Sequence, residues 1–156
     1  MTASSALPSE APRHGSCLCG AVRVTLAGPP TDVTLCHCTT CQKSGGGAFM
    51  AAVGARLGQV TLDDTAGTLA HWRTGPATQR SFCGRCGTPI AFHQDDPERD
   101  RITVWRGLFD DPSELVPTGQ IWTDSRPDWV CRIDNLPAWP KHARLPRADG
   151  HADHDR

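Results

Sequence analysis

The sequence has no excess of charge of either sign and no long apolar run. Its 156 residues carry 16 Lys and Arg against 17 Asp and Glu, a formal net charge of -1. A nearly neutral chain lacks the broad basic surface that binding to nucleic acids or anionic membranes usually needs. The longest apolar runs, such as 48–53, are far shorter than a membrane span. We therefore expect neither a nucleic-acid partner nor a membrane partner.

The N-terminal segment also lacks the features of a secretory signal. Residues 1–14 have neither a basic start nor an apolar stretch. We therefore expect a cytoplasmic protein, in which thiols stay reduced. Eight cysteines in such a compartment are more typical of metal binding than of a disulfide framework.

The composition favours short β-strands over helices. The 15 Gly and 13 Pro residues imply many turns, and 156 residues suffice for one ordinary core. We expect an all-β fold of short antiparallel strands in one domain over 14–140, between a flexible leader, 1–13, and a disordered tail, 141–156. β-branched or alternating runs predict strands at 21–26, 32–36, 48–53, 59–62, 68–73, 88–92, 101–105, 120–123 and 129–133. Helical turns are expected at 39–44 and 112–115.

Two cysteine pairs predict one closed metal site. Each pair has a spacing that can place both sulfurs on one ion, and together they supply the four thiolates of a structural zinc site: Cys17, Cys19, Cys83 and Cys86. Gly84 and Gly87 would allow the φ values that turn backbone N–H groups toward the sulfurs. The alternative is that these residues are buried free thiols.

The middle cysteine cluster is different because it has three members. Cys36, Cys38 and Cys41 lie within six residues, and the local sequence supplies no fourth sulfur. Water, a substrate thiol, Cys131 or His37 could complete the shell. A closed shell would indicate a structural role, whereas an open one would permit chemistry.

Four segments carry a family resemblance: GSCLCGAVRV, LCHCTTCQKSGGGAF, FCGRCGTPIAF and GQIWTDSRPDWV. Together they resemble the glutathione-dependent formaldehyde-activating enzyme family, which includes centromere protein V, over residues 14–140. The resemblance implies a tent-like, all-β zinc fold with two zinc ions per chain. Cys17, Cys19, Cys83 and Cys86 would hold the structural zinc, and Cys36, Cys38 and Cys41 the catalytic zinc.

The resemblance also implies a carbon–sulfur lyase that forms or cleaves the adduct of a thiol and a small aldehyde. The family model is the joining of glutathione and formaldehyde into S-hydroxymethylglutathione. Three thiolates on zinc leave a soft centre that favours a thiolate as its fourth partner, and glutathione would supply one. His37 and Thr39 are candidate proton donors. The alternatives are a lyase-like enzyme for another small substrate and a non-catalytic zinc module that binds a protein.

The remaining features have weaker interpretations. Gly45–Gly47 lacks the order of residues of a phosphate-binding loop and is interpreted as a flexible turn. Cys131 is expected to be buried among apolar residues. At most one of five tryptophans is expected to line a pocket: Trp72, Trp105, Trp122, Trp129 and Trp139. Three arginines are candidates for gripping the carboxylates of glutathione: Arg73, Arg80 and Arg85.

Overall fold

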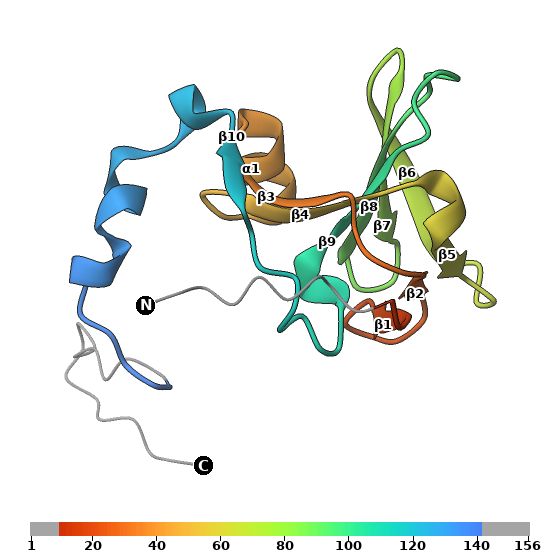
Figure 1. The fold of residues 1–156 in the computed structure, drawn as a ribbon, viewed down its shortest axis with the longest axis horizontal. Helices are drawn as coiled ribbons and strands as arrows, with labels where there is room; N and C mark the ends of the chain where they lie inside the picture. The colour runs from red at the N-terminus through yellow and green to blue at the C-terminus, as the bar shows by residue number, and fades with distance from the viewer. Residues whose placement is uncertain (1–9, 142–156) are drawn as a thin grey trace. The chain divides into compact units, whose positions relative to one another are not determined.

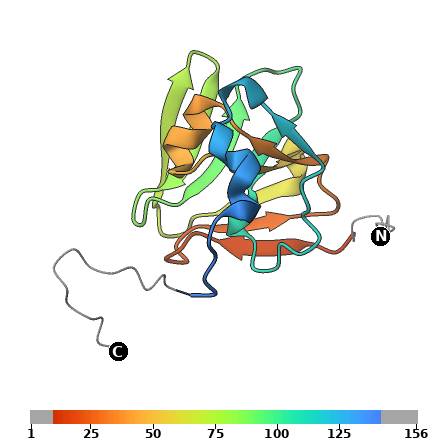
Figure 2. The same cartoon turned by 90° about the vertical axis from the view of Figure 1, so that its left-hand side faces the viewer.

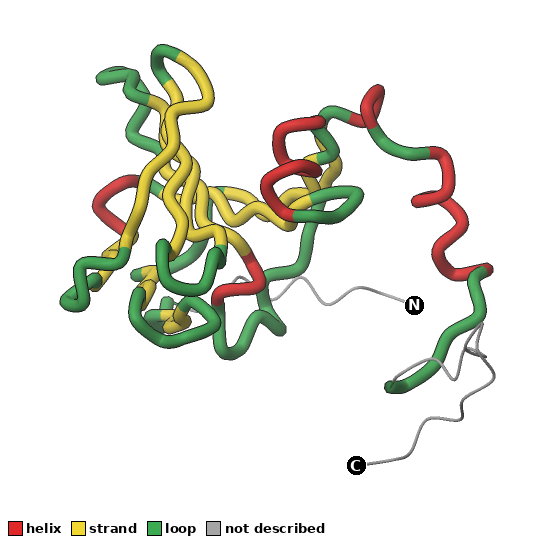
Figure 3. The backbone as a smooth tube through the Cα atoms, turned by 180° about the vertical axis from the view of Figure 1, so that it is seen from behind, coloured by secondary structure: helices red, strands yellow, loops and turns green. Residues whose placement is uncertain are grey.

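The computed structural model describes residues 10–141, which divide into two units. The first extends to Arg126 and the second begins at Pro127. Strands dominate the first unit, and its helical segments are short (Figure 3). The predicted leader and tail lie largely in 1–9 and 142–156, outside the described residues, although Arg13, the last residue of the expected leader, begins strand β1. In the described chain no helix is both long and apolar enough to cross a membrane.

In the described part of the first unit, ten strands form two sheets, whose arrangement is drawn in Figure 1. The three-stranded sheet has the order β1-β2-β5, and the seven-stranded sheet has the order β10-β3-β4-β9-β8-β7-β6. All pairs are antiparallel except β10 with β3. The strands are β1 Arg13–Ser16, β2 Arg23–Leu26, β3 Asp32–Cys36, β4 Met50–Ala55, β5 Val60–Asp63, β6 Leu69–Gly75, β7 Thr78–Cys83, β8 Pro89–Gln94, β9 Ile102–Trp105 and β10 Gly119–Ile121. The predicted fold class, mainly antiparallel β, is confirmed.

The helical segments connect or follow the strands. α1 spans Thr39–Gly45 and confirms the expected turn at 39–44; Gly46 ends it with φ 67° and an N–H bond to the Gln42 oxygen. The expected helix at 112–115 is a single turn, closed by the Leu115 N–H and the Pro112 oxygen. Residues 10–141 also contain the 3-10 helices η1 Leu57–Gln59, η2 Arg106–Leu108, η3 Thr123–Ser125 and η4 Asp128–Asn135.

One predicted strand is helical and two observed strands were not predicted, for identifiable reasons. The segment expected as a strand at 129–133 lies in η4, a 3-10 helix that follows the extended N-cap Pro127 and whose three-residue turn places Val130 and Ile133 on one side. Strands β1 and β7 were not predicted. Both have mainly polar sequences, RHGS and TQRSFC, and so lack the apolar alternation by which strands are recognised.

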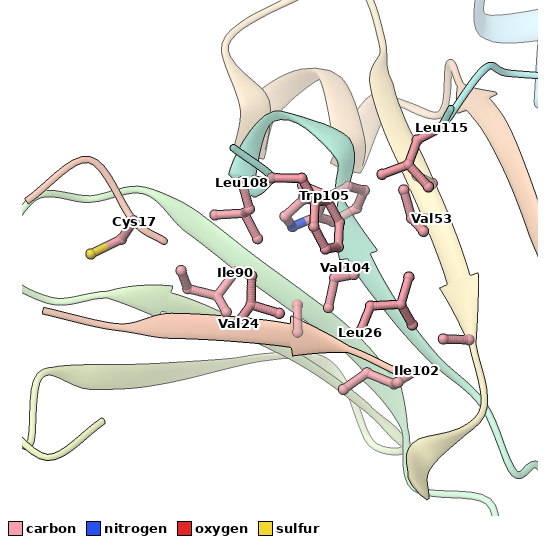
Figure 4. Close-up of a cluster of buried hydrophobic side chains, with 14 of the residues drawn as sticks. Cys17, Val24, Leu26, Val53, Ile90, Ile102, Val104, Trp105, Leu108 and Leu115 are labelled. Carbon is pink, nitrogen blue, oxygen red and sulfur yellow. The ribbon is translucent and has the colours of Figure 1, made fainter. Parts of the chain in front are cut away.

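The core joins the two sheets. Leu26 of the small sheet and Val53, Ile90 and Val104 of the large sheet are almost completely buried and meet in one cluster (Figure 4). Figure 2 shows β1 and β2 side by side at the red end of the colour range. Gly15 of β1 bridges to Phe109, and a Cβ at Gly15 would overlap the backbone of Leu108. A glycine is therefore needed where β1 crosses the chain that follows β9.

Candidate metal centres

The first cysteine cluster forms where β1 and β7 end. Cys17 and Cys19 follow β1, Cys83 ends β7, and Cys86 follows in the next turn. Their four sulfurs lie within 4.8 Å of one another. Cys19 Sγ is 3.6 Å from Cys17 Sγ and 3.8 Å from Cys83 Sγ, although the second pair is 64 residues apart in sequence. The fold thus brings together the four residues that spacing predicted as one site.

These separations fit a metal site better than disulfides. A disulfide joins sulfurs at about 2.05 Å, and all eight cysteines are free. Four sulfurs about 2.3 Å from a central zinc would lie about 3.8 Å apart at the corners of a tetrahedron. The observed 3.6 and 3.8 Å match that edge length. The four-cysteine cluster can therefore hold a metal ion.

The turns around this cluster direct polar groups at its sulfurs. The Val22 N–H donates to Cys17 Sγ at 3.3 Å, and a 3.2 Å contact with Thr88 Oγ1 is the main cause that lowers the pKa of Cys86 to about 5. Gly87 has φ 76°, as predicted, but Gly84 does not have a positive φ. A Cβ at Gly84 would instead lie 3.0 Å from the Thr68 oxygen, which is a tight contact with the backbone.

The second cluster is built from one short segment. Cys36 ends β3, Cys38 is the N-cap of α1, and Cys41 lies buried in its first turn. The three sulfurs lie within 4.8 Å of one another, and no fourth histidine, cysteine or acidic ligand of the described residues joins them. Burial raises the pKa of the Cys41 thiol to about 12, with the Arg80 side chain acting in the opposite direction. Arg80 alone thus does not offset the effect of burial, and this thiol needs a metal cation beside it to ionise at neutral pH.

His37, between two of these cysteines, faces elsewhere. Its ring is fully buried, with Nδ1 3.3 Å from the Ala48 oxygen and Nε2 2.9 Å from Gln120 Oε1. Both ring nitrogens therefore have partners outside the cluster, and Phe49 packs edge-on against the ring. His37 connects the β3–α1 corner to β10 rather than serving the three thiols. Cys131 lies in the C-terminal unit and is exposed there, so the expectation of a buried residue was wrong.

A pocket of about 530 Å³ opens beside the second cluster. Cys36, Cys38 and Cys41 line it, whereas no member of the four-cysteine cluster does. Its hydroxyl-bearing residues are Thr34, Thr39, Thr40, Thr74, Thr78, Thr103 and Ser125, and its apolar residues are Ala52, Phe92, Trp105, Ile121 and Trp122. Two tryptophans thus line the pocket, one more than expected. The pocket combines three thiols, many hydrogen-bonding groups and an aromatic wall.

Two arginines line the pocket, and they differ in their partners. Arg80 donates from Nη2 to Cys41 Sγ at 3.5 Å. Arg101, which sequence reasoning missed, is paired with Asp32 through bonds of 2.5 and 2.9 Å. Gly54 on the intervening strand makes room for that pair, because a Cβ there would overlap both side chains. No short motif marks Arg101, since its pocket position depends on strand pairing.

The other arginine candidates lie outside the pocket. Arg73 is exposed and pairs with Asp95 at 2.7 Å, and Arg85 is exposed in the turn between Cys83 and Cys86. Gly45–Gly47 also does not line the pocket: Gly45 is the last residue of α1 and Gly46 is its C-cap.

Comparison with known proteins places this arrangement in a family. The model of the family described as glutathione-dependent formaldehyde-activating enzyme matches residues 12–125, most of the chain. The chain belongs to this family. The match includes both cysteine clusters and every residue of the pocket, and it ends before the C-terminal unit, so it is shorter than the 14–140 expected from the resemblance.

Two individual proteins support the family assignment and the fold. A protein of Halomonas elongata, provisionally named glutathione-dependent formaldehyde-activating enzyme, is 28% identical over 129 residues, which cover 75% of this chain and 78% of that protein. A crystal structure of a Rhodobacter sphaeroides protein matches with a TM-score of 0.54 and 24% identity. That match covers 69% of this chain and 98% of the other, and it shows the fold alone.

Proposed function

We propose that this protein is a zinc-dependent carbon–sulfur lyase that forms or cleaves the adduct of a small thiol and a small aldehyde. Glutathione and formaldehyde are the model pair. The observation that carries the proposal is that the three-cysteine cluster lines the 530 Å³ pocket while the four-cysteine cluster does not. Family membership supports the same reaction class.

The two clusters would have different roles. Cys17, Cys19, Cys83 and Cys86 would hold a structural zinc, because four sulfurs complete a tetrahedral shell. Zinc held by Cys36, Cys38 and Cys41 would supply a soft, Lewis-acidic centre that favours a thiolate over a thiol at neutral pH. Both sites require reduced thiols, and all eight cysteines are free, which supports a cytoplasmic setting.

The residues of the pocket would bind and orient the two reactants. In the forward direction the carbon–sulfur bond forms, the carbon–oxygen π bond breaks, and the thiol proton ends on the oxygen. Phe92 and Trp105 provide an apolar wall that excludes water from the reacting carbon. Thr39 lines the pocket one residue after Cys38, so its hydroxyl is the candidate hydrogen-bond donor to the developing oxyanion. His37 is a poorer candidate, because its nitrogens contact Ala48 and Gln120.

Backbone strain supports a functional role for the end of β10. Trp122 is the described non-glycine residue with a positive φ, 58°, and its side chain both lines the pocket and remains 67% exposed. A left-handed conformation costs a bulky residue on the order of 1–3 kcal/mol and is often found at ligand sites. We propose that Trp122 contacts the bound substrate at the pocket entrance.

The reaction can be tested without isolating its product. Glutathione, ¹³C-formaldehyde and their adduct interconvert, so exchange NMR at equilibrium measures the rate in both directions. Zinc-loaded wild-type protein should accelerate the exchange, and Cys38→Ser should lose most of that acceleration. Other thiols and small aldehydes in the same assay would define the substrate.

The controls separate catalysis from zinc binding alone. Cys131→Ser should behave like the wild type, since an exposed cysteine of the C-terminal unit is not required by the proposal. Exchange no faster than in buffer, for every thiol and aldehyde pair tested with fully loaded protein, would contradict the lyase. The alternative of a non-catalytic zinc module would then be favoured.

A further inference from the structure

Arg80 occupies an unusual position beside the three-cysteine cluster. It lies on β7, paired across the sheet with Phe92 of β8. Its guanidinium carbon is 5.0 Å from the centroid of the Phe92 ring and 5.7 Å from that of Trp105, and Nη2 donates to Cys41 Sγ at 3.5 Å. The aromatic rings thus hold a positive charge against the sulfur cluster.

This charge has no carboxylate partner among the described residues. In the described chain Arg73 pairs with Asp95 and Arg101 pairs with Asp32, but no ion pair includes Arg80. Nε of Arg80 is also buried without a hydrogen-bond partner. Desolvation of this unpaired donor costs folding free energy, which the contacts with Phe92 and Trp105 offset in part. The presence of an arginine therefore needs a further reason, since a neutral side chain would avoid the cost.

The charge of the cluster explains it. Three thiolates and one divalent cation have a net charge of one negative unit, by simple addition of formal charges. The guanidinium brings this total to zero. An incoming anionic sulfur then approaches a neutral centre rather than a negative one, and in a partly desolvated pocket this difference is substantial.

We propose that Arg80 is a positioning residue that neutralises the three-cysteine centre. It thereby allows the pocket to accept a thiol in its anionic, thiolate form. The proposal rests on the proposed function and deepens it, since it names the charge of the ligand. No carboxylate lines the pocket, and Arg101 is already neutralised by Asp32, so Arg80 is the pocket cation without a carboxylate partner in the described chain. Anionic ligands are therefore preferred over neutral ones.

The test uses the full chain loaded with cobalt(II), whose thiolate-to-metal absorption reports the sulfur ligands. Wild type, Arg80→Met, Arg80→Gln and Arg80→Lys are titrated with glutathione, and metal retention is measured by competition with a chromophoric chelator. Loss of a hydrogen bond to a charged group predicts about tenfold to a hundredfold weaker thiol binding in the two neutral variants. Arg80→Met and Arg80→Gln should also lose the metal of the three-cysteine cluster more readily than the wild type. Arg80→Lys should recover part of each effect, because it keeps the charge.

Arg73→Met is the matched control. It removes an arginine from the neighbouring strand, where the side chain is exposed, paired with Asp95 and outside the pocket. It should leave thiol affinity and metal retention unchanged. Thermal melts identify which neutral variants remain folded, and the more polar Arg80→Gln serves if Arg80→Met does not fold.

The possible outcomes separate this inference from the proposed function. Equal thiol affinity and metal retention in wild type and a folded neutral variant would overturn the role of Arg80 and leave the lyase standing. If no thiol changes the wild-type spectrum, the lyase and the preference for an anionic thiol both fail. Metal retention would then still show whether Arg80 neutralises the cluster.

Discussion

The two cysteine clusters offer the same kind of ligand but differ in how the chain assembles them. The four-cysteine cluster joins the ends of β1 and β7, which belong to different sheets. The three-cysteine cluster comes from six consecutive residues at one corner, between β3 and α1. A metal in the first would hold distant parts of the chain together, whereas a metal in the second would order a short segment. Long-range assembly therefore suits a structural role, and local assembly leaves room for a pocket.

Access from the pocket sharpens the contrast between the clusters. Burial does not separate them, because Cys19 of the first cluster is exposed and Cys41 of the second is buried. All three members of the three-cysteine cluster line the pocket, whereas no member of the four-cysteine cluster does, so a small molecule in the pocket meets the second cluster. Substitutions and conditions that act on one cluster at a time test whether the two clusters have different roles.

The largest expected effect comes from Cys83→Ser compared with Cys38→Ser. Cys83→Ser removes a buried ligand from the site that joins the sheets, so the free energy of unfolding should fall by at least about 4 kcal/mol, a large effect for one substitution that reflects the loss of a structural metal. Cys38→Ser should cost less than about half as much, because its site is local. Urea unfolding of the zinc-loaded proteins measures both values.

A third variant controls for the loss of a thiol as such. Cys131→Ser should leave stability and metal content unchanged, because that side chain is exposed. Equal destabilisation by Cys83→Ser and Cys38→Ser would remove the distinction between the clusters. A loss of one metal in Cys131→Ser would show that the second shell is closed by protein, and the catalytic assignment would fail.

The next largest effect concerns metal removal. A chelator should remove two ions per chain in two steps, since the three-cysteine site lacks a fourth protein ligand in the described chain. The first ion should leave with little change in circular dichroism, and the second should leave as the fold is lost. Colorimetric zinc release recorded together with circular dichroism tests this order. Release in a single step, or unfolding with the first ion, is the contrary result.

Much of the metal chemistry was predictable because its signal is local. Cys17 with Cys19, and Cys83 with Cys86, are close pairs in sequence, and four thiolates are what tetrahedral zinc requires. The fold brings the four sulfurs within 4.8 Å of one another, so that they can hold one metal ion. Strand β3 was also predicted with its exact bounds, 32–36, since the four residues after Asp32 are β-branched or apolar and turn residues precede it.

The pocket was less predictable because its walls come from separate strands. Trp105 ends β9, Arg101 directly precedes β9, and Arg80 lies on β7. Only the order of the strands in the sheet brings these residues around the thiols. Strand β7 itself was missed, since a pocket-facing arginine breaks the apolar alternation that marks a strand. His37 was equally ambiguous: the sequence places it between two cysteines, but its distant partner, Gln120, determines where the ring points.

The smallest expected effect belongs to the ion pair at the pocket wall. Arg101 holds the pKa of Asp32 below its usual value, mainly through a hydrogen bond. Because the folded pKa is the lower one, the pair stabilises the fold fully above the unfolded value of about 3.9 and loses this contribution as the pH falls through the folded value. Both side chains are partly exposed, so Asp32→Asn should cost less than about 1 kcal/mol at pH 7.

The measured quantity is the difference in unfolding free energy between the wild type and Asp32→Asn, because loss of thiolate ligands at low pH affects both proteins alike. That difference should shrink from pH 5 toward pH 3. At pH 7 it should nearly vanish when Arg101 is also replaced by Gln. A difference that grows in acid would contradict a stabilising ion pair between Asp32 and Arg101.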